Sequence, residues 1–412
     1  MSVITYLDRV CISVAGPRMQ DALHIGPEGW GWVTGVFTLA YAAFEIPSGV
    51  MGDRIGPRRV LTRIVLWWSV FTSITGAVSN YTLLLITRFC FGMGEAGAYP
   101  NMGVTIARWF PLSARSSAWG IVLMSAQLGG AIAPFLVVPI QTQFGWRASF
   151  FLFGLFGVVW AAIWFWWFRD TPAEVPGVSL EERAETEIFV RAHHGMPWTT
   201  AIRSTNLLAL MAMAGFVGWS MSFFQSWLGT YLVRGRGFTE TGLLLASLPF
   251  LVGAIANFVG GFTGDALVQR LGLRWGRRSI GLLGYGGAAV FVVAATLTPQ
   301  RVLAVVFLSL AYGGITLGQP ALMGVCLDIG GKFSGAVTGA MNTAAYAGAF
   351  LSSVAYGYIV KAYGYEAPFL PIIGLLALGA LLWFKVDAEE ELIPELADVL
   401  TISAGRSGPA AR

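Results

Sequence analysis

Charged residues are scarce in this chain of 412 residues. Asp, Glu, Lys and Arg together make up only 12% of it, whereas 56% of the residues are hydrophobic and the mean hydropathy is +0.67. No soluble domain of this length sustains such a composition, so the sequence predicts a membrane protein. The net charge of +4 is then a signal of membrane topology, and a nucleic-acid-binding function has no support.

Motifs of catalysis and cofactor binding are also missing. The chain has no nucleophile constellation, no spacing of metal ligands, and no strand that precedes a glycine-rich phosphate turn. We therefore expect no enzyme, no metal and no cofactor. The three cysteines are odd in number and lie in apolar segments, which favours buried thiols: Cys11, Cys90 and Cys326. The start of the chain lacks the basic residues and the cleavage site of a signal peptide.

Long apolar runs are abundant instead. A membrane-spanning helix needs about 20 apolar residues, and uncharged runs of that kind cover 148–168, 207–233, 241–264, 279–297, 302–327, 333–360 and 367–384. Four further segments qualify although charges interrupt some of them, and residues 1–23 bring the total to twelve: 30–50, 60–78, 81–107 and 114–140. Backbone groups in lipid must be satisfied within each segment, so the predicted fold class is an all-α membrane protein.

The first of these segments is short at its start. Only seven residues precede Asp8, and several of them are polar. A helix with Asp8 at mid-membrane needs roughly ten more apolar residues before it. We therefore expect the first helix to be truncated at its start.

The distribution of Lys and Arg predicts the orientation. If the amino end faces the cytoplasm, sixteen of these residues fall in cytoplasmic connections and flanks, and six fall on the opposite side. Because cytoplasmic loops carry the excess of Lys and Arg, both termini are expected in the cytoplasm. The chain is predicted to be a multi-pass protein of a bacterial inner membrane, in contact with the lipid bilayer and monomeric.

One long polar stretch, residues 169–206, divides the chain into halves of six segments each. Within it the Ser-x-x-Glu spacing of Ser179 and Glu182 is a capping box, which predicts a short helix. The expected organisation is a six-helix bundle over residues 1–170, a cytoplasmic linker with that short helix over 171–204, a second six-helix bundle over 205–388, and a cytoplasmic tail over 389–412.

The two halves also repeat a loop pattern. Gly-x3-Asp-Arg-x-Gly-x-Arg-Arg follows the second segment at 49–59, and a looser copy at 264–278 follows the eighth. A pattern repeated after six spans indicates duplication into two parallel repeats. We expect these loops to gate the protein, although a basic loop that only fixes topology is the alternative. The predicted gating residues are Gly49, Asp53, Arg54, Gly56, Arg58, Arg59, Asp265, Arg277 and Arg278.

With these motifs the chain resembles a major facilitator superfamily transporter. More narrowly, it resembles the anion:cation symporter family, which includes bacterial hexuronate, glucarate and galactonate carriers and sialin. The residues that carry the narrower resemblance are 6–9 (Tyr-Leu-Asp-Arg), 46–49 (Ile-Pro-Ser-Gly), 88–96 (Arg-Phe-Cys-Phe-Gly-Met-Gly-Glu-Ala) and 107–111 (Ala-Arg-Trp-Phe-Pro). The resemblance implies the major facilitator fold of two six-helix bundles, and it covers nearly the whole chain.

Four ionisable residues interrupt the apolar segments of the first half: Asp8, Arg9, Arg88 and Glu95. A charge at that depth costs roughly 2.5–3.5 kcal/mol even on lenient scales, so such residues usually mark a path for ions or substrate. At about 1.5 Å per residue, Asp8 and Glu95 lie at one level, and Arg88 lies about 10 Å nearer the outside on the same face as Glu95.

This arrangement predicts how an anion and a proton are handled. Asp8 and Glu95 are expected to take up protons, because burial and neighbouring arginines oppose each other at a carboxylate. Arg9 and Arg88 are expected to bind or steer an anionic substrate, since a guanidinium suits a carboxylate. The resemblance implies the same roles. The alternative is a pair of static salt bridges between the first and fourth helices.

Neutral polar residues are expected to complete the substrate site. Tyr6, Gln127 and Asn342 are supported by the resemblance to sugar-acid carriers. Hydrogen bonding between helices explains Gln225, Asn257 and Gln319 equally well, and Tyr346 lies at a similar depth. For Glu45 we expect a gate salt bridge with Arg63 or a loop arginine.

The predicted function is proton-coupled symport of a small organic anion by alternating access. A sugar acid such as a hexuronate, aldonate or aldarate is the expected substrate, and sodium is the alternative to the proton as the coupling ion. One alternative is an efflux antiporter for drugs or metabolites, which predicts an acidic pocket without arginines. Another is a non-transporting sensor, which usually carries an added cytoplasmic domain.

Overall fold

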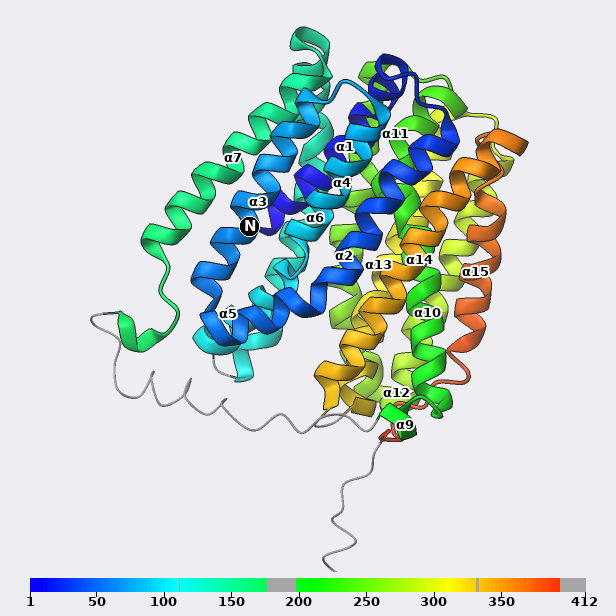
Figure 1. Ribbon diagram of the computed structural model, residues 1–412. Coiled ribbons are helices and arrows are strands. Elements are labelled where there is room, and N and C mark those ends of the chain that lie inside the picture. Colours follow the sequence, from blue (N-terminus) through cyan, green and yellow to red (C-terminus); the bar gives the residue numbers. More distant parts are fainter. Residues whose placement is uncertain (111, 176–197, 331–332, 393–412) are drawn as a thin grey trace, which may run out of the picture.

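A computed structural model describes residues 1–110, 112–175, 198–330 and 333–392. The predicted short helix at Ser179 and most of the predicted tail lie outside these ranges. Within them every assigned element is helical. Two six-helix bundles are present, as predicted, and they stand side by side in Figure 1.

The first bundle is built from α1 (Ser2–Ala22), α2 (Pro27–Ile55), α3 (Pro57–Ala77), α4 (Tyr81–Glu95) with α5 (Ala98–Trp109), α6 (Leu112–Phe144) and α7 (Trp146–Trp167). The short η1 (Pro172–Glu174) follows. Helix starts obey local rules: Pro27 and Pro57 begin their helices, where proline's missing N–H costs nothing. The Asn80 side chain accepts a hydrogen bond from the Leu83 N–H and caps α4.

The second bundle begins with α9 (Trp198–Ala201), and its first span comprises α10 (Thr205–Ser222), the π-helix η2 (Phe223–Trp227), α11 (Leu228–Thr230) and the π-helix η3 (Tyr231–Gly235). The remaining spans come from η4 (Glu240–Ala246) with α12 (Ser247–Leu297), α13 (Arg301–Gly330), α14 (Ser334–Tyr363) and α15 (Phe369–Leu382). Because α12 bends at Gly272, it supplies two of the six spans.

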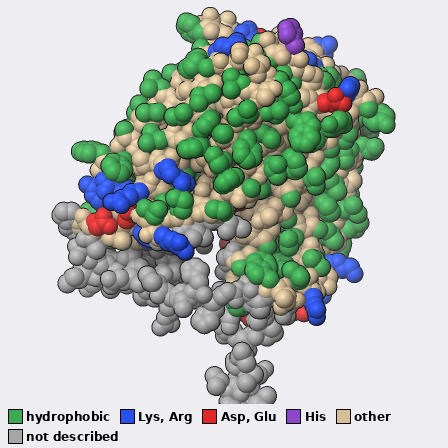
Figure 2. All heavy atoms as spheres, viewed as in Figure 1, with side chains coloured by type: hydrophobic (Ala, Val, Ile, Leu, Met, Phe, Trp, Pro, Cys, Tyr) green, Lys and Arg blue, Asp and Glu red, His purple; other side chains and the backbone are tan. Residues whose placement is uncertain are grey.

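Six helical stretches are long and apolar enough to cross a membrane by length and composition: Pro57–Ala77, Ala118–Phe144, Trp146–Trp167, Thr205–Gly235, Glu240–Leu297 and Arg301–Gly330. The first helix carries four charged residues, which lower its hydropathy: Asp8, Arg9, Arg18 and Asp21. Figure 2 shows hydrophobic side chains over the middle of one face, with most of the charged side chains toward its two ends. This distribution fits a protein surrounded by lipid.

Glycines with positive φ change two of the predicted boundaries. The fourth predicted helix, 81–107, is broken at Gly97, which has φ +84°; a Cβ there would lie 2.2 Å from Cβ of Ser48. The predicted loop over 264–278 is also wrong, since α12 continues through it except at Gly272, with φ +80°. Gly272 lies between two spans of the second bundle as Gly56 does between α2 and α3.

In Figure 1 the loop between α1 and α2 is at the upper end of the molecule, and the loop between α2 and α3 is at the lower end. The bundles meet mainly where α2 packs on α14 and α6 packs on α12. Small residues allow this approach: a Cβ on Gly31 would lie 2.6 Å from the carbonyl oxygen of Ser353. From this seam the bundles diverge toward the lower end (Figure 1).

Candidate functional site

An ion pair between α1 and α4 forms the centre of the candidate site. Arg9 Nε donates to Glu95 Oε1 at 2.6 Å, and the two side chains are only 6% and 1% exposed. Arg9 therefore points toward α4, where the Glu95 carboxylate balances its charge. Because Oε2 of Glu95 and Nη2 of Arg9 have no hydrogen-bond partner among the described residues, this pair retains unused bonding capacity.

Asp8 lies beside this pair without joining it. Its side chain is 3% exposed, and neither carboxylate oxygen has a hydrogen-bond partner in the described part of the chain. Glu95 and Arg88 act on it electrostatically. The structure thus contains one of the two salt bridges expected in the static alternative, and it leaves a second buried carboxylate unpaired. An unpaired buried carboxylate favours a bound proton.

Aromatic rings hold the two arginines. The Arg9 guanidinium lies 4.7 Å from the Tyr41 ring centroid and 5.7 Å from that of Tyr6, and the Arg88 guanidinium lies 4.5 Å from that of Phe91. Such contacts stabilise a cation without using its N–H donors. Nε of Arg88 has no hydrogen-bond partner among the described residues. Both arginines therefore keep donors available for an anion.

The break after α4 falls directly at this site. Glu95 is the last residue of α4, and α5 begins at Ala98. The Asn101 amide fixes the break, since it donates to the Gly97 carbonyl at 2.7 Å and to the Ser48 carbonyl of α2 at 3.1 Å. Discontinuous helices place free backbone groups at many transporter sites.

Two tyrosines that the sequence reasoning missed connect the bundles at this level. The Tyr312 hydroxyl on α13 donates to Gln127 Oε1 on α6 at 3.2 Å, and both side chains are buried. The rings of Tyr41 on α2 and Tyr346 on α14 stack at 4.5 Å. Neither Tyr41 nor Tyr312 interrupts an apolar run with a charge, so the sequence offered no signal for them.

The remaining neutral candidates lie at different distances from the charges. Tyr6 is beside Arg9, whereas Asn342 is half-buried on α14, one helical turn before Tyr346. Gln319 donates to the sulfur of Met221 at 3.2 Å, a contact between helices of the second bundle. Gln225 lies in the π-helix η2, a type of helix often found at functional sites.

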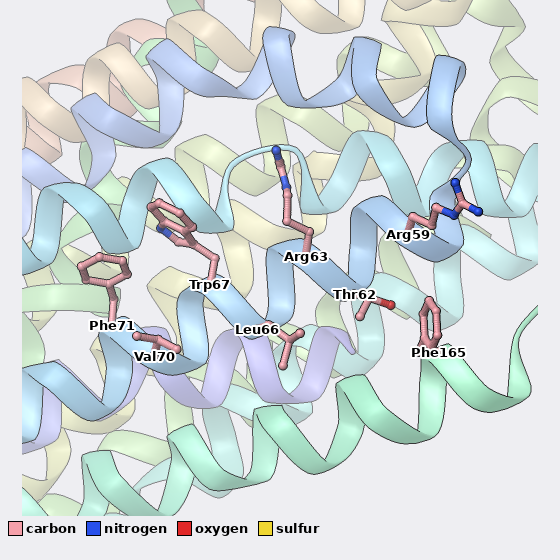
Figure 3. Close-up of a pocket in the computed structure, with 8 residues that line it drawn as sticks. All are labelled: Arg59, Thr62, Arg63, Leu66, Trp67, Val70, Phe71 and Phe165. Carbon is pink, nitrogen blue, oxygen red and sulfur yellow. The ribbon is translucent and has the colours of Figure 1, made fainter.

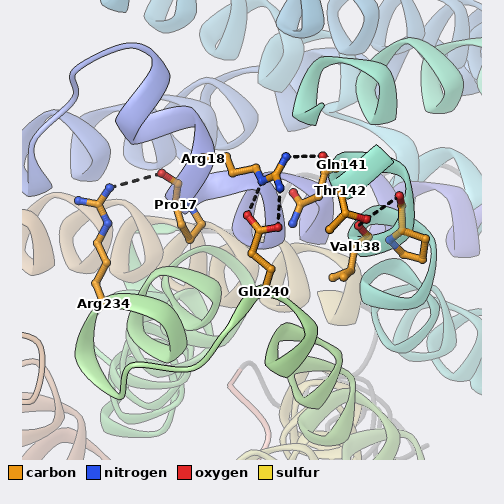
Figure 4. Close-up of polar contacts among 8 residues, drawn as sticks. Pro17, Arg18, Val138, Gln141, Thr142, Arg234 and Glu240 are labelled. Atoms are coloured by element: carbon orange, nitrogen blue, oxygen red, sulfur yellow. Dashed lines mark hydrogen bonds and ion pairs between the residues drawn. The ribbon is translucent and has the colours of Figure 1, made fainter. Parts of the chain in front are cut away.

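Polar contacts join the two bundles at the upper end (Figure 4). Arg18 on α1 pairs with both carboxylate oxygens of Glu240 on η4 and also donates to the backbone carbonyl of Gln141 on α6. Gln20 donates to Thr230 at 2.9 Å, and Lys361 pairs with Glu28 at 2.8 Å. These contacts link the two bundles at the upper end of the molecule.

The predicted gating residues of the first bundle contact their own bundle at the lower end. The Arg58 N–H donates to Asp170 Oδ1 at 2.8 Å, and its guanidinium donates to the Phe165 carbonyl. The Asp170 carboxylate lies against Gly56, where a Cβ would approach within 2.5 Å. Of the other predicted residues in this bundle, Gly49 lies against Pro100, whereas Arg54 and Arg59 are exposed. The side chain of Asp53 lies outside the description.

In the second bundle, Arg277 pairs with Asp328 of α13 at 3.0 Å, and Arg278 donates to the Val386 carbonyl at 2.9 Å. Asp265 is exposed. The gating role of both sets stays a prediction, since their contacts are within single bundles. The expected ion pair of Glu45 with Arg63 or a loop arginine is not found among the described side chains, and Arg63 instead donates to Ser48 Oγ at 3.4 Å.

Comparisons with known proteins agree on one family. The family model of the Major Facilitator Superfamily matches residues 1–353. A protein of Cupriavidus necator named "Probable sulfoacetate transporter" is 34% identical, over 92% of this chain and 90% of that protein. The hexuronate transporter of Bacillus subtilis is 29% identical, over 92% of this chain and 90% of that protein. A solved bacterial homologue of the human lysosomal transporter Spinster is 19% identical, covers 96% of this chain and 97% of that one, and shares the fold with a TM-score of 0.77.

Proposed function

Since this chain belongs to the Major Facilitator Superfamily, whose relatives here are transporters and not enzymes, we propose that it carries out proton-coupled symport of a small organic anion. One observation carries the proposal. A buried carboxylate without a hydrogen-bond partner, Asp8, lies beside the Arg9–Glu95 pair, and both arginines keep free donors. An anion and a proton are the two species that such a cluster can accept together.

The coupling follows from charge balance. Two carboxylates and two arginines give the buried cluster a net charge of zero when all four are ionised, and an added anion would leave an uncompensated charge. Protonation of Glu95 releases Arg9 for the anion, and protonation of Asp8 removes a negative charge near Arg88. Anion entry is therefore favourable together with proton entry.

Sugar acids are the proposed substrate class, because one relative is named a hexuronate transporter. The relative named a probable sulfoacetate transporter supports the wider class of small organic acids. The acid group would bind Arg9 and Arg88. Hydroxyl groups would bind neutral donors and acceptors at Tyr6, Gln127 and Asn342, which lie on both bundles.

We further propose that the lower end faces the cytoplasm of a bacterial cell, with both termini there. The Lys and Arg distribution supports this orientation. The contact of Arg18 with Glu240 between the bundles at the upper end supports an inward-facing arrangement in this orientation. In this proposal, bundles with the bounds 1–170 and 205–388 would rock about the central site to expose it alternately to the two sides.

The test is uptake by the full chain in proteoliposomes. A panel of hexuronate, aldonate, aldarate and sulfoacetate is offered with an imposed pH gradient, with a sodium gradient, and with neither. We expect accumulation of at least one acid only when the outside is acidic. Glu95→Gln should abolish gradient-driven uptake and retain exchange of substrate. Absence of gradient-dependent uptake for every acid would overturn the proposal. Uptake driven by a sodium gradient alone would identify sodium, and not the proton, as the coupling ion.

A further inference from the structure

The surface-exposed face of α3 carries a hollow of about 630 Å³, which is separate from the proposed transport site. Figure 3 shows its lining residues along α3, with Phe165 of α7 at one edge. Two arginines, Arg59 and Arg63, lie at the lower end of this groove, and apolar side chains continue from them toward the middle of the molecule.

The groove is basic at one end and apolar along the rest of its length. Arg59, Arg63, Leu66 and Val70 recur every three or four residues, so they form one stripe along the helix. Leu66, Trp67 and Val70 are 39%, 40% and 51% exposed and line the same hollow, and a contiguous exposed apolar wall of this kind is ordinary for a surface in contact with lipid. Trp67 is fixed in this wall, since its indole N–H donates to the Cys90 carbonyl at 2.8 Å.

The arginines lack anionic partners within the described side chains. Arg59 is exposed and makes no hydrogen bond or ion pair there. Arg63 reaches only neutral atoms, Met51 Sδ at 3.2 Å and Ser48 Oγ at 3.4 Å. At 1.5 Å per residue these two lie about 3 Å and about 9 Å along α3 from Pro57. A cation at that depth on a lipid-facing surface requires an anion or strong hydration.

We propose that this groove is a binding site for one anionic phospholipid of the adjoining leaflet. Its phosphate would lie between Arg59 and Arg63, and one acyl chain would cover Leu66, Trp67 and Val70. Basic pockets between transmembrane helices recognise headgroups in this way. A soluble phosphate would satisfy the arginines but would leave the apolar wall uncovered, so the charge and the apolar length together favour a lipid.

Native mass spectrometry of the full chain in a non-ionic detergent tests the proposal. Phosphatidylglycerol, phosphatidylcholine and inorganic phosphate are each titrated, and bound adducts are counted. We expect phosphatidylglycerol to bind at least about tenfold more tightly than phosphatidylcholine, and Arg59→Gln with Arg63→Gln to remove that preference. Arg270→Gln is the matched control, because Arg270 is an exposed arginine of the other bundle; it should leave the affinity within about twofold.

Two further variants keep the test decisive if the double substitution fails to fold. Arg59→Lys with Arg63→Lys preserves the charge and should keep most of the preference. Val70→Trp fills the apolar part and should weaken binding of phosphatidylglycerol while the arginines remain. Equal binding of both lipids, competition by millimolar inorganic phosphate, or unchanged binding in all groove variants would each overturn the assignment to a phospholipid.

Discussion

At the scale of single residues, the buried charges differ in how far their surroundings satisfy them. One oxygen of Glu95 accepts from Arg9, whereas neither oxygen of Asp8 has a partner in the described chain. The ionised form of Asp8 is thus the less compensated of the two, and a proton there costs no ion pair. Proton binding would begin at Asp8, and Arg9 would be released only when Glu95 is protonated as well.

Asp8→Asn tests this order. Asparagine keeps the size and the neutral charge of a protonated Asp8, so we expect the variant to bind and exchange substrate. Accumulation driven by a pH gradient should fall to the level reached without the gradient. Uptake in proteoliposomes and counterflow exchange measure the two properties separately. If Asp8→Asn retained full gradient-driven accumulation, Asp8 would have no part in coupling.

Tyr312→Phe tests the role of the uncharged hydrogen-bonding residues of the site. It removes the hydroxyl that donates to Gln127 and leaves the ring packed against Phe224. A hydrogen bond of this kind is worth about 0.5–1.5 kcal/mol, so we expect KM for a hydroxylated acid to rise about fivefold at unchanged maximal rate. Tyr285→Phe is the matched control, because the buried Tyr285 hydroxyl has no partner among the described residues. An equal effect of both changes would exclude a specific role for Tyr312.

At the scale of helices, the sequence predicted most spans because apolar runs and membrane thickness define them together. The four charges were found for the same reason, since each interrupts such a run. The backbone geometry at two glycines could not be predicted from the sequence. Nothing in the composition near Gly97 or Gly272 distinguishes a left-handed glycine from the many helical ones. Tyr312 and Tyr41 were missed because their importance comes from packing against the other bundle, which no local pattern encodes.

Gly97→Ala tests the break between α4 and α5. The left-handed conformation costs a non-glycine residue about 1–2 kcal/mol, and the added Cβ would also collide with Ser48. We expect a lower unfolding temperature in detergent, together with weaker proton-driven uptake because Glu95 ends α4. Gly286→Ala is the control, since a Cβ there meets nothing within 4 Å. Unchanged stability and uptake in Gly97→Ala would show that the break is not needed.

At the scale of the whole molecule, the two bundles are held together from the central site to the upper end. The central site contributes the stack of Tyr41 on Tyr346 and the contact of Tyr312 with Gln127. The upper end contributes ion pairs on more exposed side chains. The proposed transport by alternating access requires the upper contacts to break while the central ones respond to substrate. Partly exposed pairs suit that task, because each is worth only about 1 kcal/mol or less and breaks at small cost.

Glu240→Gln should therefore shift the whole molecule toward opening at the upper end. The change weakens the contact with Arg18, whose side chain is 33% exposed, so an effect of about 1 kcal/mol, or about fivefold in the open population, is expected. Spin labels at Ala22→Cys and Thr241→Cys, with the native cysteines replaced, would report the distance between the bundles. Glu366→Gln is the matched control, because it breaks the Arg236–Glu366 pair of 2.9 Å within one bundle. A longer-distance population in Glu240→Gln but not in the control would identify the Arg18–Glu240 contact as part of the upper gate, whereas identical distributions would reduce it to a surface ion pair.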